Sequence, residues 1–398
     1  MSYEHLSPRA SHVFLMLASY PGADFPGALA NAVQPGGEAV LGELVREGLL
    51  RAVPGGRYRY SSLARAHALQ HAEGTALERI VAWYLDYAVA ADKAVSRFRW
   101  RLSPRYEQVA AFPGTDVEAL DLLEADRASF VSLVRAAHES GMDELVVGLC
   151  EALWGLHFHR KHYTDWKTVN ELGVVSAQRL GDRRAEGRIR CQLGFHHLEL
   201  DEVERAVEQF DLALRADRSV QHHQGMATDL ESLALAHYGV GRYQDALDCL
   251  LAAEPLAVRA GQEQQIALRG HHYYRVLSAL GRAEEALAGL TGTLHAMRER
   301  GDRYNEGRVL TSLGEAQLRV GANRAAIEAL TPALAIMQEL RRLFQEAVVR
   351  EVLCAALLAA GDRGGAVAHA EHALAIYQVL DHPRANSAAQ RLERLNQR

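Results

Sequence analysis

The sequence has few cysteines and no long apolar run. Its 4 cysteines are scattered without a CxxC pair, which predicts a reduced, cytoplasmic protein. No stretch of about 18 consecutive apolar residues occurs, so we expect no membrane span. The opening segment, MSYEHLSPRASHVFLML, carries polar residues where the apolar core of a signal peptide would lie.

Motifs of nucleotide binding and catalysis are missing as well. There is no GxxxxGK[ST] phosphate loop, no GxSxG turn, no dinucleotide glycine fingerprint and no HExxH zinc motif. We therefore predict no cofactor, no metal site and no catalytic residue, and interpret the chain as a protein that is not an enzyme. A catalytic triad assembled from distant segments would leave no such motif, so enzymatic activity stays an alternative.

An excess of basic charge is also missing. Lys and Arg total 44 against 50 Asp and Glu, which leaves a net charge of -6 and argues against a general nucleic-acid binder. The composition is 48% hydrophobic and 24% charged, as in an ordinary folded chain and unlike a disordered one.

Histidine is plentiful, with 19 residues. His157, His159 and His162 lie close together in the segment HFHRKH, but the first two do not share a helical face. The adjacent pairs His196–His197, His222–His223 and His271–His272 diverge by about 100° on a helix, which is poor geometry for chelating one ion. We interpret these histidines as structural or surface residues.

A repeat governs the C-terminal part of the chain. Two sets of residues recur at intervals of 40: Leu193, Leu233, Tyr273, Leu313 and Leu353, and Ala206, Ala246, Ala286, Ala326 and Ala366. A fixed period over several copies predicts an array of helix pairs. The small alanine opens the second helix of each pair and lets the two helices approach closely. Residues after Pro383 are polar enough to form a terminal capping helix.

The N-terminal residues have a different pattern. Ser7-Pro8 predicts a helix start, residues 25–33 a short helix and residues 38–50 another. Arg51–Tyr60, RAVPGGRYRY, indicates a hairpin with its turn at Pro54-Gly55-Gly56. Three helices followed by a hairpin are typical of a winged helix.

Three zones follow from these patterns. Residues 1–74 form the winged-helix-like module, residues 75–145 a helical connector, and residues 146–398 the repeat array with its cap. Within the connector we expect helices at 78–98 and 117–139, joined by a loop at 99–116.

The repeat resembles the tetratricopeptide pattern. Leu193-Gly194 followed by Ala206, Phe210 and Ala213 has its order of small and large residues. The usual period is about 34 residues, and the longer period here is similar to arrays at the C-termini of actinobacterial antibiotic-regulatory and other STAND-type ATPase regulators. The inter-unit phrase at Gly181–Arg184 looks like theirs, as do three upstream phrases: YPGADF at Tyr20–Phe25, RYRYSSLARAHA at Arg57–Ala68 and EALDLLEADRASFVSLVRAA at Glu118–Ala137.

The resemblance implies a mainly α fold, with the winged-helix-like module followed by a right-handed α-solenoid of tetratricopeptide-like pairs. Two departures stand out. The phosphate loop is missing, and Ser61-Ser62 replaces the His-Asp pair with which the family senses a nucleotide phosphate. The chain is interpreted either as a fragment of a larger regulator or as a stand-alone descendant, which Ser61-Ser62 favours.

In the tetratricopeptide pattern, one stripe of each first helix lines a concave groove. This resemblance implies a groove formed by Arg188, Phe195, Glu231, Leu235, Tyr238, His271, Arg275, Arg308, Glu315 and Glu351. Mixed charge beside aromatic rings suits a partner protein, a peptide or a small amphipathic ligand. The alternative is a solvated face without a ligand. Tyr274 stands where the family has a small residue, so it either reshapes the groove or is absorbed by repacking.

The function we predict is that of a non-catalytic sensor or scaffold in a transcriptional or signalling regulator. The first alternative is a DNA-binding regulator, with Arg51, Arg57 and Arg59 touching the phosphate backbone. The expected recognition helix carries Glu38, Glu43 and Glu47, so direct nucleic-acid binding is not expected. The second alternative is a structural assembly platform.

Overall fold

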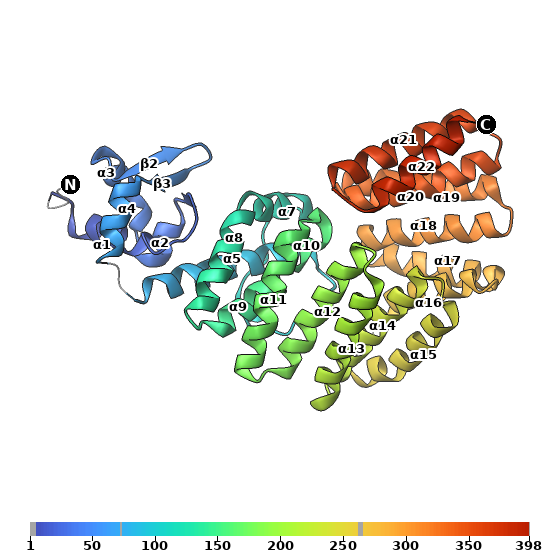
Figure 1. Cartoon of the computed structure of the whole chain (residues 1–398), viewed down its shortest axis with the longest axis horizontal. Helices are drawn as coiled ribbons and strands as arrows, with labels where there is room; N and C mark the ends of the chain where they lie inside the picture. The colour runs from blue at the N-terminus through green and yellow to red at the C-terminus, as the bar shows by residue number, and fades with distance from the viewer. Residues whose placement is uncertain (1–4, 72–73, 262–265, 398) are drawn as a thin grey trace. The chain divides into compact units, whose positions relative to one another are not determined.

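The protein is described by a computed structural model at residues 5–71, 74–261 and 266–397, and it divides into two compact units (Figure 1). The first unit contains the described residues up to Leu156 and Lys167–Ala185, and the second contains His157–Trp166 and the residues from Glu186 onward. The zone boundaries near residues 74 and 145 stay predictions. In the described parts of the chain, no helix combines the length and apolarity needed to cross a membrane.

The first half of the chain contains helices of varied length and one small sheet. Its elements are α1 (Pro8–Leu17), β1 (Phe25–Pro26), α2 (Leu29–Val33), the 3-10 helix η1 (Gly37–Val40), α3 (Leu41–Arg46), β2 (Leu50–Val53), β3 (Arg57–Tyr60), α4 (Ser62–Leu69), α5 (Ala76–Val95), α6 (Arg105–Gln108), α7 (Asp116–Ala125), α8 (Arg127–Glu139), α9 (Asp143–Ala152), α10 (Trp154–Arg160) and α11 (Tyr163–Leu180).

The second half is a regular series of helices. These are α12 (Arg183–Glu199), α13 (Val203–Ser219), α14 (His223–Gly239), α15 (Tyr243–Arg259), α16 (Ile266–Ala279), α17 (Ala283–Glu299), α18 (Arg303–Arg319), α19 (Asn323–Glu339), α20 (Leu343–Ala359), α21 (Arg363–Val379) and α22 (Arg384–Asn396).

Local capping and strand pairing account for the N-terminal elements. Ser7 begins α1 because its hydroxyl accepts a hydrogen bond from the amide of Ala10, and Pro8 follows at the first helical position. The sheet is antiparallel with strand order β1-β3-β2, and Leu50 of β2 pairs with Tyr60 of β3. Ser61, one of the residues that replaces the family's His-Asp pair, caps α4 through a bond from the amide of Ala64.

Two helices predicted in this region are shorter than expected. The helix expected at 25–33 begins only at Leu29, because Phe25–Pro26 pairs with β3. The helix expected at 38–50 is a 3-10 turn followed by α3, which ends at Arg46. Gly48 has a φ of 69° and turns the chain into β2, a conformation that glycine adopts without strain.

Aromatic contacts join these N-terminal elements to α5 and α8. The ring of Tyr20 stacks on that of Tyr84, with 5.8 Å between centroids, and its hydroxyl donates to Ser129 at 2.5 Å. Tyr84 also meets Phe130 edge to face at 5.5 Å. Buried ring pairs add to the energy of area burial, so this cluster anchors the N-terminal elements within the first unit.

The connector contains more helix ends than its sequence predicted. The helix expected at 117–139 is divided at Asp126, which separates α7 from α8 and has non-helical backbone angles. The loop expected at 99–116 contains the single-turn helix α6. Its Tyr106 is buried and donates a hydrogen bond to Asp92 at 2.8 Å, which explains why this turn is ordered against α5.

In the second unit, helices form antiparallel pairs: α12 with α13, α14 with α15, α16 with α17, α18 with α19 and α20 with α21 (Figure 1). The recurring leucines and alanines lie in the interfaces. Ala206, Ala246, Ala286, Ala326 and Ala366 are all fully buried. α22 follows the last pair and packs on α21.

The turn inside each pair requires a left-handed residue. Gly241, Gly281, Gly321 and Gly361 have φ values of 76°, 86°, 75° and 89°, and Asp201 takes the same role with 58°. The left-handed region is open to glycine and tolerated by aspartate, so these positions reverse the chain at a fixed place in each pair.

In each of three helix pairs, a glycine on one helix faces a large side chain on the partner helix. A Cβ added to Gly194 or Gly314 would collide with Phe210 or Leu330 on the second helix of the same pair. In the third pair the sizes are reversed, since Tyr274 is large and Gly289 on α17 leaves room for its ring. Of the two expectations for Tyr274, repacking is the one the structure supports.

The first helices lie on the inner side of the array. The first helices α14, α16, α18 and α20 each contact their neighbour in this row, whereas the second helices α15, α17, α19 and α21 have no comparable contacts with one another among the described residues. A series of pairs that is tighter along one row curves toward that row. The first helices therefore line the concave side.

Candidate functional site

The concave side carries a group of arginine and histidine side chains. We call Arg275, Arg308 and Arg342, with the histidines His271 and His272, the cation cluster. Arg275 and His271–His272 come from α16, Arg308 from α18 and Arg342 from the start of α20. The guanidinium of Arg275 lies 4.3 Å from the ring centroid of Tyr238, and Arg308 donates to the side chain of Asn305 at 3.0 Å. In the described part of the chain, neither Arg275 nor Arg308 has a carboxylate within salt-bridge distance.

The imidazoles of the cation cluster are uncharged. His271 is 1% exposed, stacks on His272 with 5.3 Å between centroids, and places Nε2 2.9 Å from the hydroxyl of Ser312. Burial lowers the pKa of both histidines well below the usual range, and Arg308 lowers it further. Burial likewise lowers the pKa of Arg308, and Arg275 adds to this effect. The positive charge at this place therefore comes from the arginine side chains and not from the imidazoles.

Tyr304 lies at the centre of the positive region. Its ring centroid is 5.7 Å from the guanidinium of Arg308 and 5.9 Å from that of Arg342, and the ring of His159 meets it edge-on at 5.0 Å. Its hydroxyl is shielded from solvent and has no hydrogen-bond partner among the described residues. Buried hydroxyls are almost always bonded.

Next to Tyr304, the second unit is closed by a contact between distant segments. We call Lys161, Glu199, Phe344 and His382 the closing contact. Lys161 Nζ lies 2.8 Å from Glu199 Oε2 and 4.5 Å from the ring centroid of Phe344, and Glu199 Oε2 is 3.7 Å from His382 Nε2. Lys161 and His382 have side chains only 1% exposed.

Charge pairing dominates the closing contact. Burial would raise the pKa of Glu199, but Lys161 and His382 lower it to about 2. The carboxylate is therefore ionised at all physiological pH values and neutralises Lys161. Glu199 and Asp302 act on Arg308 only from beyond salt-bridge distance.

Further along the concave side, Glu231 of α14 pairs with Arg269 of α16 at 3.1 Å. The two side chains are 12% and 11% exposed. Burial raises the pKa of Glu231 to about 7, against the opposing effect of Arg269. This carboxyl group therefore titrates near neutral pH.

Arg188 does not face the groove openly. It is 6% exposed and lies among buried acids, since it lowers the pKa of Asp217 and of Asp229. For both carboxyl groups burial is the larger influence and raises the pKa. Gly187 and Gly225 leave room for the Asp217 carboxylate.

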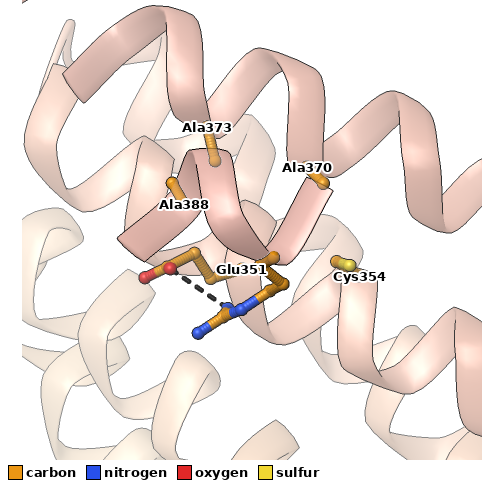
Figure 2. A pocket seen from close by; sticks show the side chains of 6 residues that line it. Glu351, Cys354, Ala370, Ala373 and Ala388 are labelled. Carbon is orange, nitrogen blue, oxygen red and sulfur yellow. Dashed lines mark ion pairs between the residues drawn. The ribbon is translucent and has the colours of Figure 1, made fainter. Parts of the chain in front are cut away.

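Glu351 lies in a small hollow between α20, α21 and α22 (Figure 2). The hollow is lined by Glu351, Cys354, Ala370, Ala373, Ala388 and Arg391. Glu351 forms an ion pair with Arg391 of α22 at 3.1 Å and accepts a hydrogen bond from Tyr377 at 2.9 Å. The capping helix thus engages Glu351 and separates it from the cation cluster.

The remaining residues predicted for the groove are half-buried. Phe195 packs against Phe210 and Phe158, with ring centroids 5.3 and 6.3 Å apart. Leu235 and Glu315 are half-buried on α14 and α18. The structure thus brings together Tyr238, His271, Arg275 and Arg308, while Arg188 and Glu351 belong to separate clusters.

The arginines predicted to touch DNA are largely occupied within the first unit. Arg57 pairs with Asp24 at 2.6 Å and with Asp126 at 2.7 Å, and Arg59 pairs with Asp24 at 2.8 Å. Arg51 is exposed on β2. Carboxylates already neutralise two of these guanidinium groups, which opposes phosphate binding.

Several residues of this site were missed from the sequence. Lys161, Glu199, Tyr304, Arg342 and His382 were not predicted to lie near the groove. One signal was present, because Tyr304 and Phe344 occupy the same place in successive repeats. For the histidines, no group of three or more His, Cys, Asp or Glu residues in the described ranges is arranged to hold a metal ion.

No family model matches the sequence. The chain is 25% identical to the regulatory protein AfsR of Streptomyces griseus, in an alignment covering 99% of this chain and 45% of that protein. It is 27% identical to the regulatory protein AfsR of Streptomyces coelicolor, covering 86% of this chain and 32% of that protein. The chain therefore spans less than half the length of these curated relatives. They confirm the resemblance to actinobacterial regulators.

Among solved structures, the chain is similar to a STAND protein with a tetratricopeptide repeat sensor from Pyrococcus horikoshii. The sequence identity is 14% and the TM-score 0.49, and the alignment covers 99% of this chain and 60% of that one.

Proposed function

We propose that this chain, whose relatives are AfsR-type regulatory proteins, is a non-catalytic sensor region that binds a partner protein or peptide on the concave side of its helix pairs. The observation that carries the proposal is the cation cluster. Arg275 and Arg308 are held on the concave side without acidic partners in the described chain, beside the rings of Tyr238 and Tyr304. Holding partly buried guanidinium groups without a salt bridge is unfavourable, so a surface of this kind favours binding of a ligand that supplies the missing negative charge.

The regulatory role rests on the relatives, and the mode of action on the fold. Helix pairs that contact mainly their neighbours can change curvature when a ligand contacts several of them at once. Binding across α14, α16, α18 and α20 would favour one curvature of the array. In this proposal the winged-helix-like module formed by α1–α4 and the sheet receives or transmits that change.

Affinity capture tests this proposal. The purified protein is expected to retain a partner from a lysate of its native cells. Arg275→Glu and Arg308→Glu are each expected to abolish retention while circular dichroism shows an unchanged fold, because either substitution reverses the charge at the site. Unchanged retention by both folded variants would contradict the proposal.

The alternative of DNA binding has a separate test. A mobility-shift assay across salt concentrations would show specific binding that weakens steeply with salt. The pairing of Arg57 and Arg59 with Asp24 argues against that outcome. An assembly platform would instead self-associate without any ligand in size-exclusion chromatography with light scattering.

A further inference from the structure

We propose that the cation cluster binds an extended acidic peptide segment, with carboxylates of the segment paired to Arg275 and Arg308. This inference rests on the proposed function and specifies the chemistry of its ligand. It starts from the imbalance described above, in which Glu199 neutralises Lys161 while Arg275 and Arg308 have no carboxylate within salt-bridge distance in the described chain.

Guanidinium groups favour a ligand that carries oxyanions. Arginine presents several donors in a planar fork that matches a carboxylate or a phosphate. The hydroxyl of Tyr304 has no hydrogen-bond partner among the described residues. The Nδ1 atoms of His271 and His272 have none there either. His271 and His272 are 1% and 6% exposed, so these unpaired nitrogens are well inside the array.

The placement of the charges favours an extended ligand over a single small anion. Arg275 and Arg308 come from two successive first helices, α16 and α18. Packed helices are about 8–10 Å apart, and an extended peptide advances about 3.3 Å per residue. One step between helices therefore corresponds to about three residues. A segment with two carboxylates a few residues apart would meet both guanidinium groups.

The overall charge distinguishes an acidic peptide from a nucleic acid. The whole chain has a net charge of -6, so a long polyanion would be repelled outside the local positive region. A short peptide with a few carboxylates is attracted locally. The rings of Tyr238 and Tyr304 beside the guanidinium groups also provide apolar surface for the peptide's side chains.

The test uses the full chain and three fluorescein-labelled probes in an anisotropy titration. These are the nonapeptide (Glu-Gly-Ser)3, its counterpart (Gln-Gly-Ser)3, and an oligothymidylate of similar length. Inorganic phosphate serves as competitor. The glutamate peptide is expected to bind at least about tenfold more tightly than the glutamine peptide, because hydrogen bonds to charged groups contribute that much or more. This comparison needs no variant and is unaffected by changes in folding.

Variants then locate the site. Arg275→Gln and Arg308→Gln are each expected to weaken binding of the glutamate peptide about tenfold and to leave the glutamine peptide unchanged. Arg324→Gln is the matched control, because Arg324 lies on the second helix α19 with a side chain 94% exposed. It is expected to have no effect.

Several results would overturn the inference. These are equal affinity for the two peptides, unchanged binding in both arginine variants, or stronger binding of the oligothymidylate. Full competition by phosphate at concentrations equal to those of the peptide would also assign the site to a free anion. If retention of the native partner is lost with Arg275→Glu or Arg308→Glu while the glutamate and glutamine peptides bind with equal affinity, the proposed function stands and this inference fails.

Discussion

At the scale of single residues, the balance between burial and ion pairing decides the charge of the buried carboxyl groups in the second unit. Glu231 has Arg269 at 3.1 Å, yet burial raises its pKa to about 7. Glu199 is buried as well, but two partners lower its pKa to about 2. Glu199 is therefore ionised at neutral pH whereas Glu231 titrates there, because the number of cationic neighbours differs.

Glu231 should make stability depend on pH. Its folded-state pKa of about 7 exceeds the ordinary value of about 4.3, so between these values the folded chain holds a proton that the unfolded chain has lost. The resulting stabilisation is complete below pH of about 4 and is lost as the pH rises toward 7. Glu231→Gln lacks this titration. Urea unfolding measures this effect. As the pH rises from about 4 to about 7, the free energy of unfolding of the wild type should fall by on the order of 1–3 kcal/mol relative to that of the variant. A constant difference would contradict the assignment.

Gly289 should be intolerant of a side chain. A Cβ there would collide with the ring of Tyr274, so Gly289→Ala is expected to lower the free energy of unfolding by about 1–3 kcal/mol. Gly292 lies on the same helix with nothing near its Cβ position, so Gly292→Ala is expected to be stabilising by about 0.5–1 kcal/mol. Chemical denaturation measures both. Equal effects from the two substitutions would show that Tyr274 does not fill this space.

At the scale of elements, the closing contact joins helices that are far apart in the chain. Lys161 follows α10, Glu199 ends α12, Phe344 lies in the first turn of α20 and His382 precedes α22. An array of helix pairs otherwise has contacts mainly between neighbours. This contact therefore couples the stability of its first and last members.

Removing one partner of the closing contact should loosen both of its sides. Lys161→Met leaves Glu199 buried without its main counter-charge, which is expected to reduce stability by about 3–5 kcal/mol. Hydrogen exchange should then speed up together in residues 157–166 and in the first turns of α20 and α22. The control Arg324→Met breaks an exposed pair with Glu328 and should change stability by less than about 1 kcal/mol. Faster exchange confined to residues 157–166 would disprove the coupling.

At the scale of the whole molecule, periodic features could be predicted from the sequence and long-range contacts could not. The recurring alanines predicted the interfaces between paired helices, and all five are buried there. These depend on neighbouring residues only. Lys161 and Phe344 meet because small rotations accumulate over many pairs, and no local pattern records that sum.

The candidate site was predicted in part for the same reason. Arg275, Arg308 and Tyr238 were expected on one stripe because the resemblance to the tetratricopeptide pattern implies it, and they lie together. Arg188 and Glu351 occupy the same stripe, but buried acids surround the first and α22 engages the second. Whether a residue on the stripe can contact a ligand depends on the side chains and helices that pack over it.

Hydrogen-exchange mass spectrometry of the protein, alone and bound to the partner recovered by affinity capture, tests the central claim most directly. Ligand binding on the concave side predicts protection in α14, α16, α18 and α20, largest around Arg275 and Arg308, with little change in α15, α17, α19 and α21. Protection confined to these second helices or to residues 50–60 would contradict it.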